Sequence, residues 1–196
     1  KYAMVFDAGT GAGRCNLFDM SGRLVSYAYR EWEYLKDLSS SNKEAMLFDA
    51  EQFKKILFSL CRKVITQAGI SADEIVAVSA TSQREGMVWL DRFGKEIYAA
   101  PSVDLRGEEA ADILSGKEPF IKEITGLPVS GMFGLARLLW YKKFNEAVYD
   151  RIDTVMMISD WICYLLCGSK VSEPSVASSS QLFDIKNGKW SSELLK

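Results

Sequence analysis

The sequence predicts an α/β domain with a mixed β-sheet flanked by helices, and three observations indicate it. The first third alternates short apolar runs with turns, which is typical of strands. A long segment then repeats apolar residues at helical spacing. A β-branched run follows and is typical of a buried parallel strand. The resulting order βββαβ, continued by mixed elements, is that of an α/β fold.

The first three strands are expected to form an antiparallel meander. Apolar runs at Tyr2–Asp7 and Cys15–Met20 flank a glycine-rich turn, Gly9–Gly13, and a second turn leads into Arg23–Trp32. We expect the glycine-rich turn to be exposed at one end of the sheet. The polar, serine-rich segment Lys36–Glu44 is predicted to be an exposed loop.

The middle of the chain predicts one long helix, one strand and one hairpin. Asp49 is a suitable N-cap for the helix, and Gly69 ends it. Ile75–Ser79 is predicted to be a buried parallel strand. Val88–Leu90 and Ile97–Ala99 are predicted to pair as a hairpin.

The second half predicts three helices and two strands. Ser159-Asp160 is expected to cap one helix, which runs to Leu166 and is stopped by Gly168. The other helices are expected at Arg106–Leu114 and Gly134–Phe144, and the strands at Thr154–Ile158 and Gln181–Ile185.

Composition excludes several classes of protein. The 196 residues are 48% hydrophobic and 26% charged, so a packed core is expected. A net charge of −2 argues against a nucleic-acid surface. No apolar run approaches the roughly 20 residues that span a bilayer, and the N-terminus lacks a signal-peptide layout. We therefore expect a soluble, cytoplasmic protein.

Histidine is absent, which excludes histidine-based triads, histidine-ligated zinc and histidine general bases. The four cysteines, Cys15, Cys61, Cys163 and Cys167, each lie in an apolar context. We expect buried, reduced thiols, because a metal site would need further ligands.

The segment Asp7-Ala-Gly-Thr-Gly-Ala-Gly-Arg14 has the composition of a phosphate site. Backbone N–H groups of a glycine-rich turn can cradle a phosphate, and a neighbouring carboxylate can hold hydrated Mg²⁺. No Gly-Lys-Ser/Thr follows, so this is no Walker loop, and a strand rather than a helix follows. The alternative interpretation is a glycine-rich hairpin with a chance aspartate.

Two charged pairs follow strand ends, where open α/β sheets bind ligands. Arg84 and Glu85 follow the predicted strand Ile75–Ser79, and Asp104 and Arg106 follow the hairpin. Guanidinium donors beside carboxylate acceptors suit vicinal hydroxyls. Either pair alone is more often an ordinary surface salt bridge.

Six motifs occur in the order found in one enzyme family, and the chain resembles the N-terminal domain of the FGGY carbohydrate kinases. The resemblance implies an actin/Hsp70/sugar kinase-like (ribonuclease H-like) fold. Within the family, the motifs are most similar to those of autoinducer-2 kinases, with glycerol and pentulose kinases as alternatives. The motifs are Asp7-Ala-Gly-Thr10 with Arg14, Ser82–Gly86, Val103–Arg106, Thr125–Val129, Ser159–Ile162 and Ala177–Asp184.

The resemblance also implies roles for single residues. Asp7 would hold Mg²⁺, and the other ATP-binding residues would be Gly9, Thr10, Gly11 and Arg14. Arg14 either neutralises phosphate or only pins the hairpin. Arg84, Glu85 and Asp104 would bind the substrate.

The resemblance implies that residues 1–196 are the N-terminal, substrate-binding domain of a two-domain kinase. The C-terminal ATP-binding domain is absent from the chain, and the general base is expected beyond Lys196 in a Gly-Gly-Gly-Asp-like segment. No catalytic residue is therefore expected within the chain, and the isolated fragment is expected to be inactive.

The expected partner is a small sugar-like molecule, with no nucleic acid and no membrane, and a homodimer is compatible with the resemblance. Two functions of other classes stay open. One is a non-catalytic, actin-like nucleotide-binding protein, which would not need Arg84, Glu85 and Asp104. The other is a sugar-sensing module that binds its ligand without ATP turnover.

Overall fold

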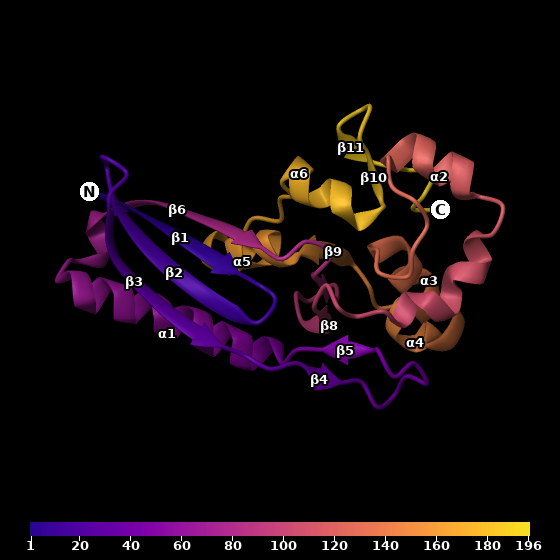
Figure 1. The fold of residues 1–196 in the computed structure, drawn as a ribbon, viewed down its shortest axis with the longest axis horizontal. Coiled ribbons are helices and arrows are strands. Elements are labelled where there is room, and N and C mark those ends of the chain that lie inside the picture. Colours follow the sequence, from indigo (N-terminus) through magenta and orange to yellow (C-terminus); the bar gives the residue numbers. More distant parts are fainter.

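The computed structural model describes residues 1–196 and contains two main β-sheets (Figure 1). The first sheet has the order β3-β2-β1-β6 and the second has the order β8-β7-β9. The strands of the first are β1 (Tyr2–Ala8), β2 (Ala12–Asp19), β3 (Leu24–Glu31) and β6 (Ile75–Ser82). Those of the second are β7 (Met87–Leu90), β8 (Glu96–Ala100) and β9 (Thr154–Met157).

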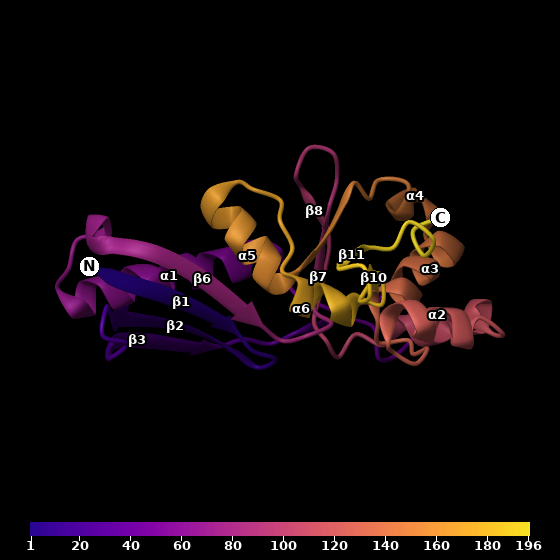
Figure 2. The same cartoon turned by 90° about the horizontal axis from the view of Figure 1, so that it is seen from above.

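The remaining elements surround these sheets. The helices are α1 (Ala50–Ala68), α2 (Glu118–Thr125), α3 (Gly134–Phe144), α4 (Glu146–Tyr149), α5 (Ile158–Cys167) and α6 (Pro174–Ala177). The 3₁₀ helices are η1 (Ala72–Glu74), η2 (Arg106–Leu114) and η3 (Ser178–Ser180). Two small ribbons pair β4 (Leu35–Lys36) with β5 (Met46–Leu47) and β10 (Phe183–Asp184) with β11 (Lys189–Trp190). Figure 2 shows the first sheet and α1 at one end of an elongated molecule and α2, α3 and α4 at the other.

The predicted meander is confirmed: β1 pairs antiparallel with β2, and β2 with β3. β6 joins the other side of β1 in parallel, which makes the sheet mixed. In the parallel register Asp7 lies opposite Thr81, and Ala8 opposite Ser82. The segments that follow β1 and β6 therefore leave the sheet at the same level.

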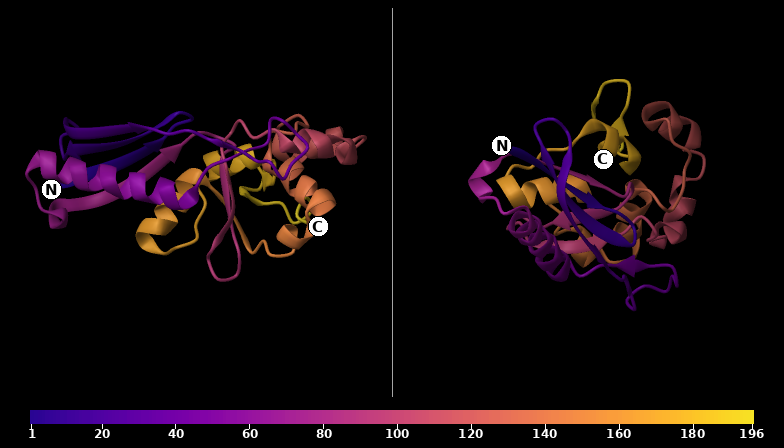
Figure 3. Two further views of the ribbon diagram at one scale, coloured as in Figure 1. Left: turned by 90° about the horizontal axis from the view of Figure 1, so that it is seen from below. Right: turned by 60° about the vertical axis from the view of Figure 1, so that its left-hand side comes forward.

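One face of the first sheet forms the main core. Because side chains alternate along a strand, Met4, Phe6 and Ala8 all point to this face, and each is at most 2% exposed. They belong to one apolar cluster with residues of α1 and α5. Figure 3 shows α1 lying along the sheet.

Helix α1 begins and ends where the sequence predicts. The Asp49 carboxylate accepts a hydrogen bond from the backbone N–H of Gln52 at 3.0 Å. Gly69 ends the helix in the left-handed conformation, with φ of 66°, which glycine adopts without a Cβ penalty.

The prediction of a buried Ile75–Ser79 strand is wrong in its burial. Val76 is 50% and Val78 46% exposed, because β6 is an edge strand of the four-stranded sheet. The predicted Arg106–Leu114 helix has those bounds, but it is a 3₁₀ helix. Both windings bring residues three or four apart together, so apolar spacing over nine residues does not distinguish them.

Helix α5 begins at Ile158, so the predicted cap at Ser159-Asp160 is also wrong. The N–H of Ile158 donates to the Gly86 carbonyl, and that of Ser159 to Ser82 Oγ, each at 3.1 Å. The segment Ser82–Gly86 therefore satisfies two N–H groups of the first turn, and no side chain of the helix has to do so.

Three short helices, α2, α4 and α6, were not predicted from the sequence. The predicted exposed loop Lys36–Glu44 starts at the last residue of β4 and leads toward β5. Its Asp37 side chain is an exception to the predicted exposure, because it is only 9% exposed. All four cysteines are free thiols, but only Cys15 is buried as predicted; Cys61 and Cys163 are partly exposed and Cys167 is exposed. No helix combines the length and apolar composition that a bilayer crossing needs.

Candidate functional site

The glycine-rich turn lies between β1 and β2, with the strand pair Asp7 and Arg14 at its base. Arg14 Nη1 donates to Asp7 Oδ2 at 3.0 Å, and the guanidinium lies 5.4 Å from the centre of the Tyr29 ring. Both charged side chains are partly exposed, so the pair contributes little to stability. The contact between Arg14 and Asp7 is compatible with both predicted roles of Arg14, and Asp7 Oδ1 has no partner in the chain.

Two aromatic residues hold the turn from the inside. Trp32 Nε1 donates to the Thr10 carbonyl at 3.1 Å, and Trp32 N donates to the Gly11 carbonyl, also at 3.1 Å. The Tyr34 hydroxyl donates to the same Thr10 carbonyl. The carbonyl groups of Thr10 and Gly11 are therefore fixed toward the protein.

Gln83 completes this arrangement on the other side of the turn. Its backbone N–H donates to the Ala8 carbonyl at 2.8 Å, and its Nε2 donates to the Gly9 carbonyl at 3.3 Å. In a trans peptide the N–H points opposite to the carbonyl. The N–H groups of Thr10 and Gly11 consequently point away from the interior, and neither has a partner in the chain.

The turn fits a phosphate with a hydrated cation. A hollow of about 440 Å³ adjoins it and is lined by Gly9, Thr10, Gly11, Ala12, Arg14, Tyr29 and Glu31. Two outward N–H donors suit phosphate, and Asp7, at the base of the turn with one free carboxylate oxygen, could hold Mg²⁺ through water. No cluster of three acidic, cysteine or histidine residues could chelate a metal directly. The residues therefore fit a hydrated ion and not a caged one.

Replacing two glycines of this hairpin by alanine should affect the stability of the chain differently. A Cβ on Gly13 would lie 2.4 Å from a Trp32 ring carbon, and Trp32 cannot shift freely because its ring packs 4.7 Å from that of Phe53. Gly13→Ala should therefore destabilise the chain by about 1–3 kcal/mol in urea unfolding. A Cβ on Gly11 meets nothing within 4 Å, so Gly11→Ala should preserve stability. Equal losses in both variants would contradict this packing.

Arg84 and Glu85 project beyond the end of β6. Arg84 is exposed and Glu85 is half-buried with a left-handed backbone, at φ of 60°. Neither side chain takes part in an ion pair of the chain, so the ordinary salt-bridge interpretation does not describe them. Burial raises the pKa of the Glu85 carboxyl above its ordinary value of 4.5, and the charges of Arg84 and Arg137 oppose that shift.

Asp104 does not lie on this surface, because its side chain is fully buried. Its Oδ2 accepts hydrogen bonds from Arg106 Nε at 2.8 Å and from the Tyr98 hydroxyl at 2.5 Å. Its Oδ1 accepts from the Met46 N–H at 3.1 Å. Arg106, also fully buried, in addition donates to Asp37 at 2.8 Å. Desolvation acts to raise the pKa of Asp37, but hydrogen bonds from Ser39 and the ion pair with Arg106 outweigh it and lower that pKa.

Arg137 joins this buried cluster to the Arg84–Glu85 segment, and the sequence analysis did not single it out. Its Nη1 donates to the Glu85 carbonyl at 2.8 Å, and its Nη2 donates to the Ser102 carbonyl at 3.2 Å. Its Nε lies 4.0 Å from Asp104 Oδ2. The only sequence signal was a charged residue among the apolar positions of a predicted helix. The structure thus connects Glu85 and Asp104 through Arg137 without placing both at a surface.

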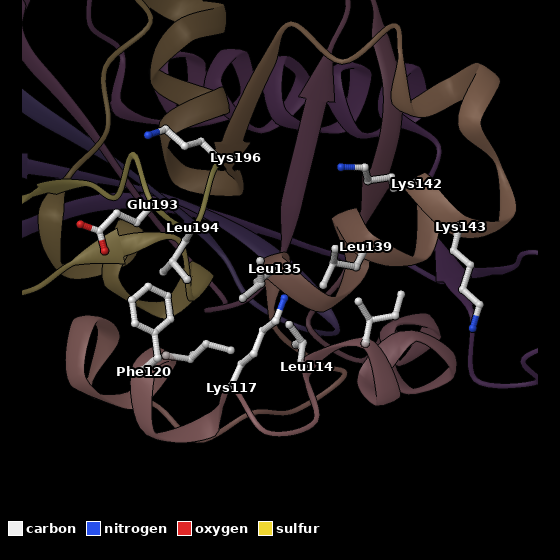
Figure 4. A pocket seen from close by; sticks show the side chains of 12 residues that line it. Leu114, Lys117, Phe120, Leu135, Leu139, Lys142, Lys143, Glu193, Leu194 and Lys196 are labelled. Atoms are coloured by element: carbon white, nitrogen blue, oxygen red, sulfur yellow. The ribbon is translucent and has the colours of Figure 1, made fainter.

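Arg84 and Glu85 line none of the five pockets described in the chain and form an open ledge, with the buried Asp104 beneath it. Figure 4 shows a pocket of about 380 Å³ that lies elsewhere, between η2, α2, α3 and the C-terminal residues. Leucine side chains form its floor, and Lys117, Lys142, Lys143 and Lys196 surround it. No residue that the sequence predicts for a site lines it.

Comparison with known sequences identifies the family. A model of the FGGY family of carbohydrate kinases, N-terminal domain, matches residues 2–196. An autoinducer-2 kinase from Salmonella paratyphi B is 33% identical over 201 residues, which cover 100% of this chain and 37% of that protein. An autoinducer-2 kinase from Escherichia coli is 34% identical over 203 residues, covering 99% of this chain and 37% of its own. The chain thus spans less than two-fifths of the length of these relatives.

Solved structures share the fold. A xyloylose kinase from Brucella ovis superposes with a TM-score of 0.91 at 21% identity, covering 100% of this chain and 40% of its own. A glycerol kinase from Plasmodium falciparum, solved with ADP, gives 0.84 at 21% identity, covering 98% and 40%. The predicted fold class, a mixed α/β domain of the actin-like ATPase type, is confirmed. The chain belongs to the FGGY family of carbohydrate kinases and matches that family's N-terminal domain.

Proposed function

We propose that the protein containing this chain transfers a phosphoryl group from ATP to a hydroxyl of a small sugar-like molecule in the cytoplasm. One observation carries the proposal. The turn with two outward N–H groups and the ledge with unpaired Arg84 and Glu85 leave adjacent parallel strands at the same level. A phosphate donor and a polyol acceptor could therefore lie side by side at this edge.

The roles follow from the geometry. The N–H groups of Thr10 and Gly11 would donate to phosphate oxygens, and Asp7 would hold Mg²⁺ through water. The bound ion would supply positive charge against the phosphates. Arg84 would donate to substrate hydroxyls, and the Glu85 carboxylate would accept from them. The buried Asp104 would act indirectly, by holding the arginines beneath the ledge, and the general base would come from elsewhere in the intact protein.

Autoinducer-2 is the substrate that we propose first. Relatives that match the whole chain at 33–34% identity are autoinducer-2 kinases, whereas the glycerol kinase and xyloylose kinase share the fold at 21%. The chain contains no histidine and has Arg84-Glu85 where the family resemblance implies a Met-His pair in xylulokinases, which argues against a xylulokinase. Glycerol and pentuloses are the alternative substrates.

A phosphorylation assay tests the proposal. Full-length protein and the 196-residue chain are compared with ATP and each of three acceptors: the autoinducer-2 precursor, glycerol and xylulose. We expect turnover by the full-length protein and none by the chain, which lacks the closure that contributes up to about 7–11 kcal/mol of positioning. Comparable turnover by the 196-residue chain would contradict the proposal that catalysis needs the rest of the full-length protein. Acceptor binding by full-length protein without ATP turnover would instead favour the sugar-sensing module.

A further inference from the structure

Gln83 contacts the phosphate turn and Ser102 through one amide group. Its Nε2 donates to the Gly9 carbonyl at 3.3 Å and to the Tyr34 hydroxyl at 2.9 Å. Its Oε1 accepts from the Ser102 N–H and from the Ser102 hydroxyl, both at 2.8 Å. Both donor positions and both acceptor positions of the amide are therefore in use.

The partners fix the orientation of this amide. The backbone N–H of Ser102 can only donate, and the Gly9 carbonyl can only accept. Rotating the amide by 180° would place its NH₂ group against the Ser102 N–H and its oxygen against the Gly9 carbonyl. Only the observed orientation satisfies both sides, so one amide holds the Gly9 carbonyl and Ser102 at the same time.

The contacts of Gln83 continue to the ledge. The Ser102 carbonyl accepts from Arg137, whose other terminal nitrogen donates to the Glu85 carbonyl. An unbroken hydrogen-bonded path thus joins the peptide that aims the Thr10 N–H to the peptide that places Glu85. Gln83 is the member of this path that touches the turn.

We infer that Gln83 is a positioning residue that holds the phosphate turn with its amide nitrogen and, through Ser102 and Arg137, the substrate ledge with its amide oxygen. The inference rests on the proposed function for its catalytic meaning, but both structural roles can be measured without any ligand. Gln83 contacts neither reactant in this account. It sets the direction of the Thr10 N–H and, through Ser102 and Arg137, the position of Glu85.

Two substitutions at Gln83 separate the two sides. Gln83→Glu keeps an acceptor for Ser102 but loses the donor to Gly9, and it places a carboxylate oxygen against that carbonyl. Gln83→Leu removes the hydrogen bonds to the turn and those to Ser102. Gln67→Glu and Gln67→Leu are matched controls, because Gln67 is exposed near the end of α1 and its one side-chain bond is to Ser26.

Amide hydrogen exchange in the full-length protein, read by NMR, gives the ligand-free test. The amides of Gly9 and Trp32 report on the turn, because they bond to Ala12 and Gly11, and the amide of Ser102 reports on the Gln83 oxygen. We expect Gln83→Glu to accelerate exchange at Gly9 and Trp32 only. Gln83→Leu should accelerate exchange at all three.

Kinetics of the same variants give the functional test. We expect Gln83→Glu to raise KM for ATP about 5-fold, the lower end of the range for a carbonyl left unpaired, because the Gly9 carbonyl is only partly buried, while KM for the acceptor changes less than about twofold. Gln83→Leu should raise both. If Gln83→Glu does not fold, Tyr34→Phe takes its place. It removes one hydroxyl from the turn side and should raise KM for ATP alone.

The outcomes separate the two proposals. A wild-type protein without ATP turnover would refute the proposed function, and the exchange data would still decide the role of Gln83. Exchange that changes uniformly along the chain, that changes no more than in the Gln67 variants, or that rises at Ser102 as strongly in Gln83→Glu as in Gln83→Leu would overturn this role of Gln83 even if the enzyme is an active kinase.

Discussion

Replacing Asp104 by alanine is expected to destabilise the fold by about 3–5 kcal/mol, the usual cost of leaving buried charges unpaired. Asp104 lies within ion-pair distance of two fully buried arginines, Arg106 and Arg137. Its removal also strands the buried Tyr98 hydroxyl and the Met46 N–H. The loss should appear in urea unfolding and as a fall in melting temperature of roughly 6–20 °C.

The control for this variant is Asp153→Ala. Asp153 forms an exposed ion pair with Lys170, with both side chains more than a third accessible. The same chemical change there should leave the unfolding midpoint close to that of the wild type. A stable Asp104→Ala protein that instead loses acceptor affinity would show that Asp104 binds the substrate directly, as the sequence predicts.

Replacing Glu85 by glutamine is expected to lower kcat/KM for the acceptor about 10- to 200-fold in the full-length protein, since a hydrogen bond to a charged group contributes about 1.5–3 kcal/mol. Glutamine keeps the size and one acceptor oxygen but removes the charge. Glu146→Gln is the control, because Glu146 is exposed and makes no side-chain bond. An unchanged kcat/KM in Glu85→Gln would remove Glu85 from the site.

The pH dependence provides a second readout for the same variant. Burial raises the pKa of Glu85, so its carboxylate is protonated at a higher pH than an exposed glutamate. Wild-type kcat/KM should therefore fall as pH decreases through that raised pKa, above 4.5, and the variant should lack this step. The free energy of unfolding changes with pH in the opposite direction to kcat/KM. The folded state binds the proton more tightly than the unfolded chain, so Glu85 costs stability as pH rises through the same interval.

Local patterns were sufficient for the parts of the fold that depend on neighbouring residues. The meander follows from two short turns, and the register that places Asp7 opposite Arg14 follows from the length of the first turn. Helix α1 could be bounded from Asp49 and Gly69, because capping acts within one turn of the helix.

Burial of charged residues could not be predicted in the same way. The sequence places Asp104 and Arg106 after a strand that carries their partner Tyr98, but the partners Asp37 and Tyr141 come from a distant loop and from α3. Whether such a pair faces water or the interior depends on those tertiary neighbours. For the same reason, the sequence indicated Arg84 and Glu85 but not Gln83, which stands directly before them.

The parallel pairing of β1 with β6 can form only late during synthesis of the chain. The Gly9 carbonyl and the Gln83 amide that holds it are 74 residues apart in the chain. At roughly 5–20 residues per second, a ribosome needs about 4–15 s to make that interval, whereas a hairpin closes in about 1–10 μs. The Gly9 carbonyl of the nascent β1–β2 hairpin therefore waits for seconds without its partner, although Trp32 and Tyr34 are already available to the Thr10 carbonyl. We expect nucleotide affinity to arise only after β6 has docked, so the nucleotide cannot template the earliest folding of the strands that bind it.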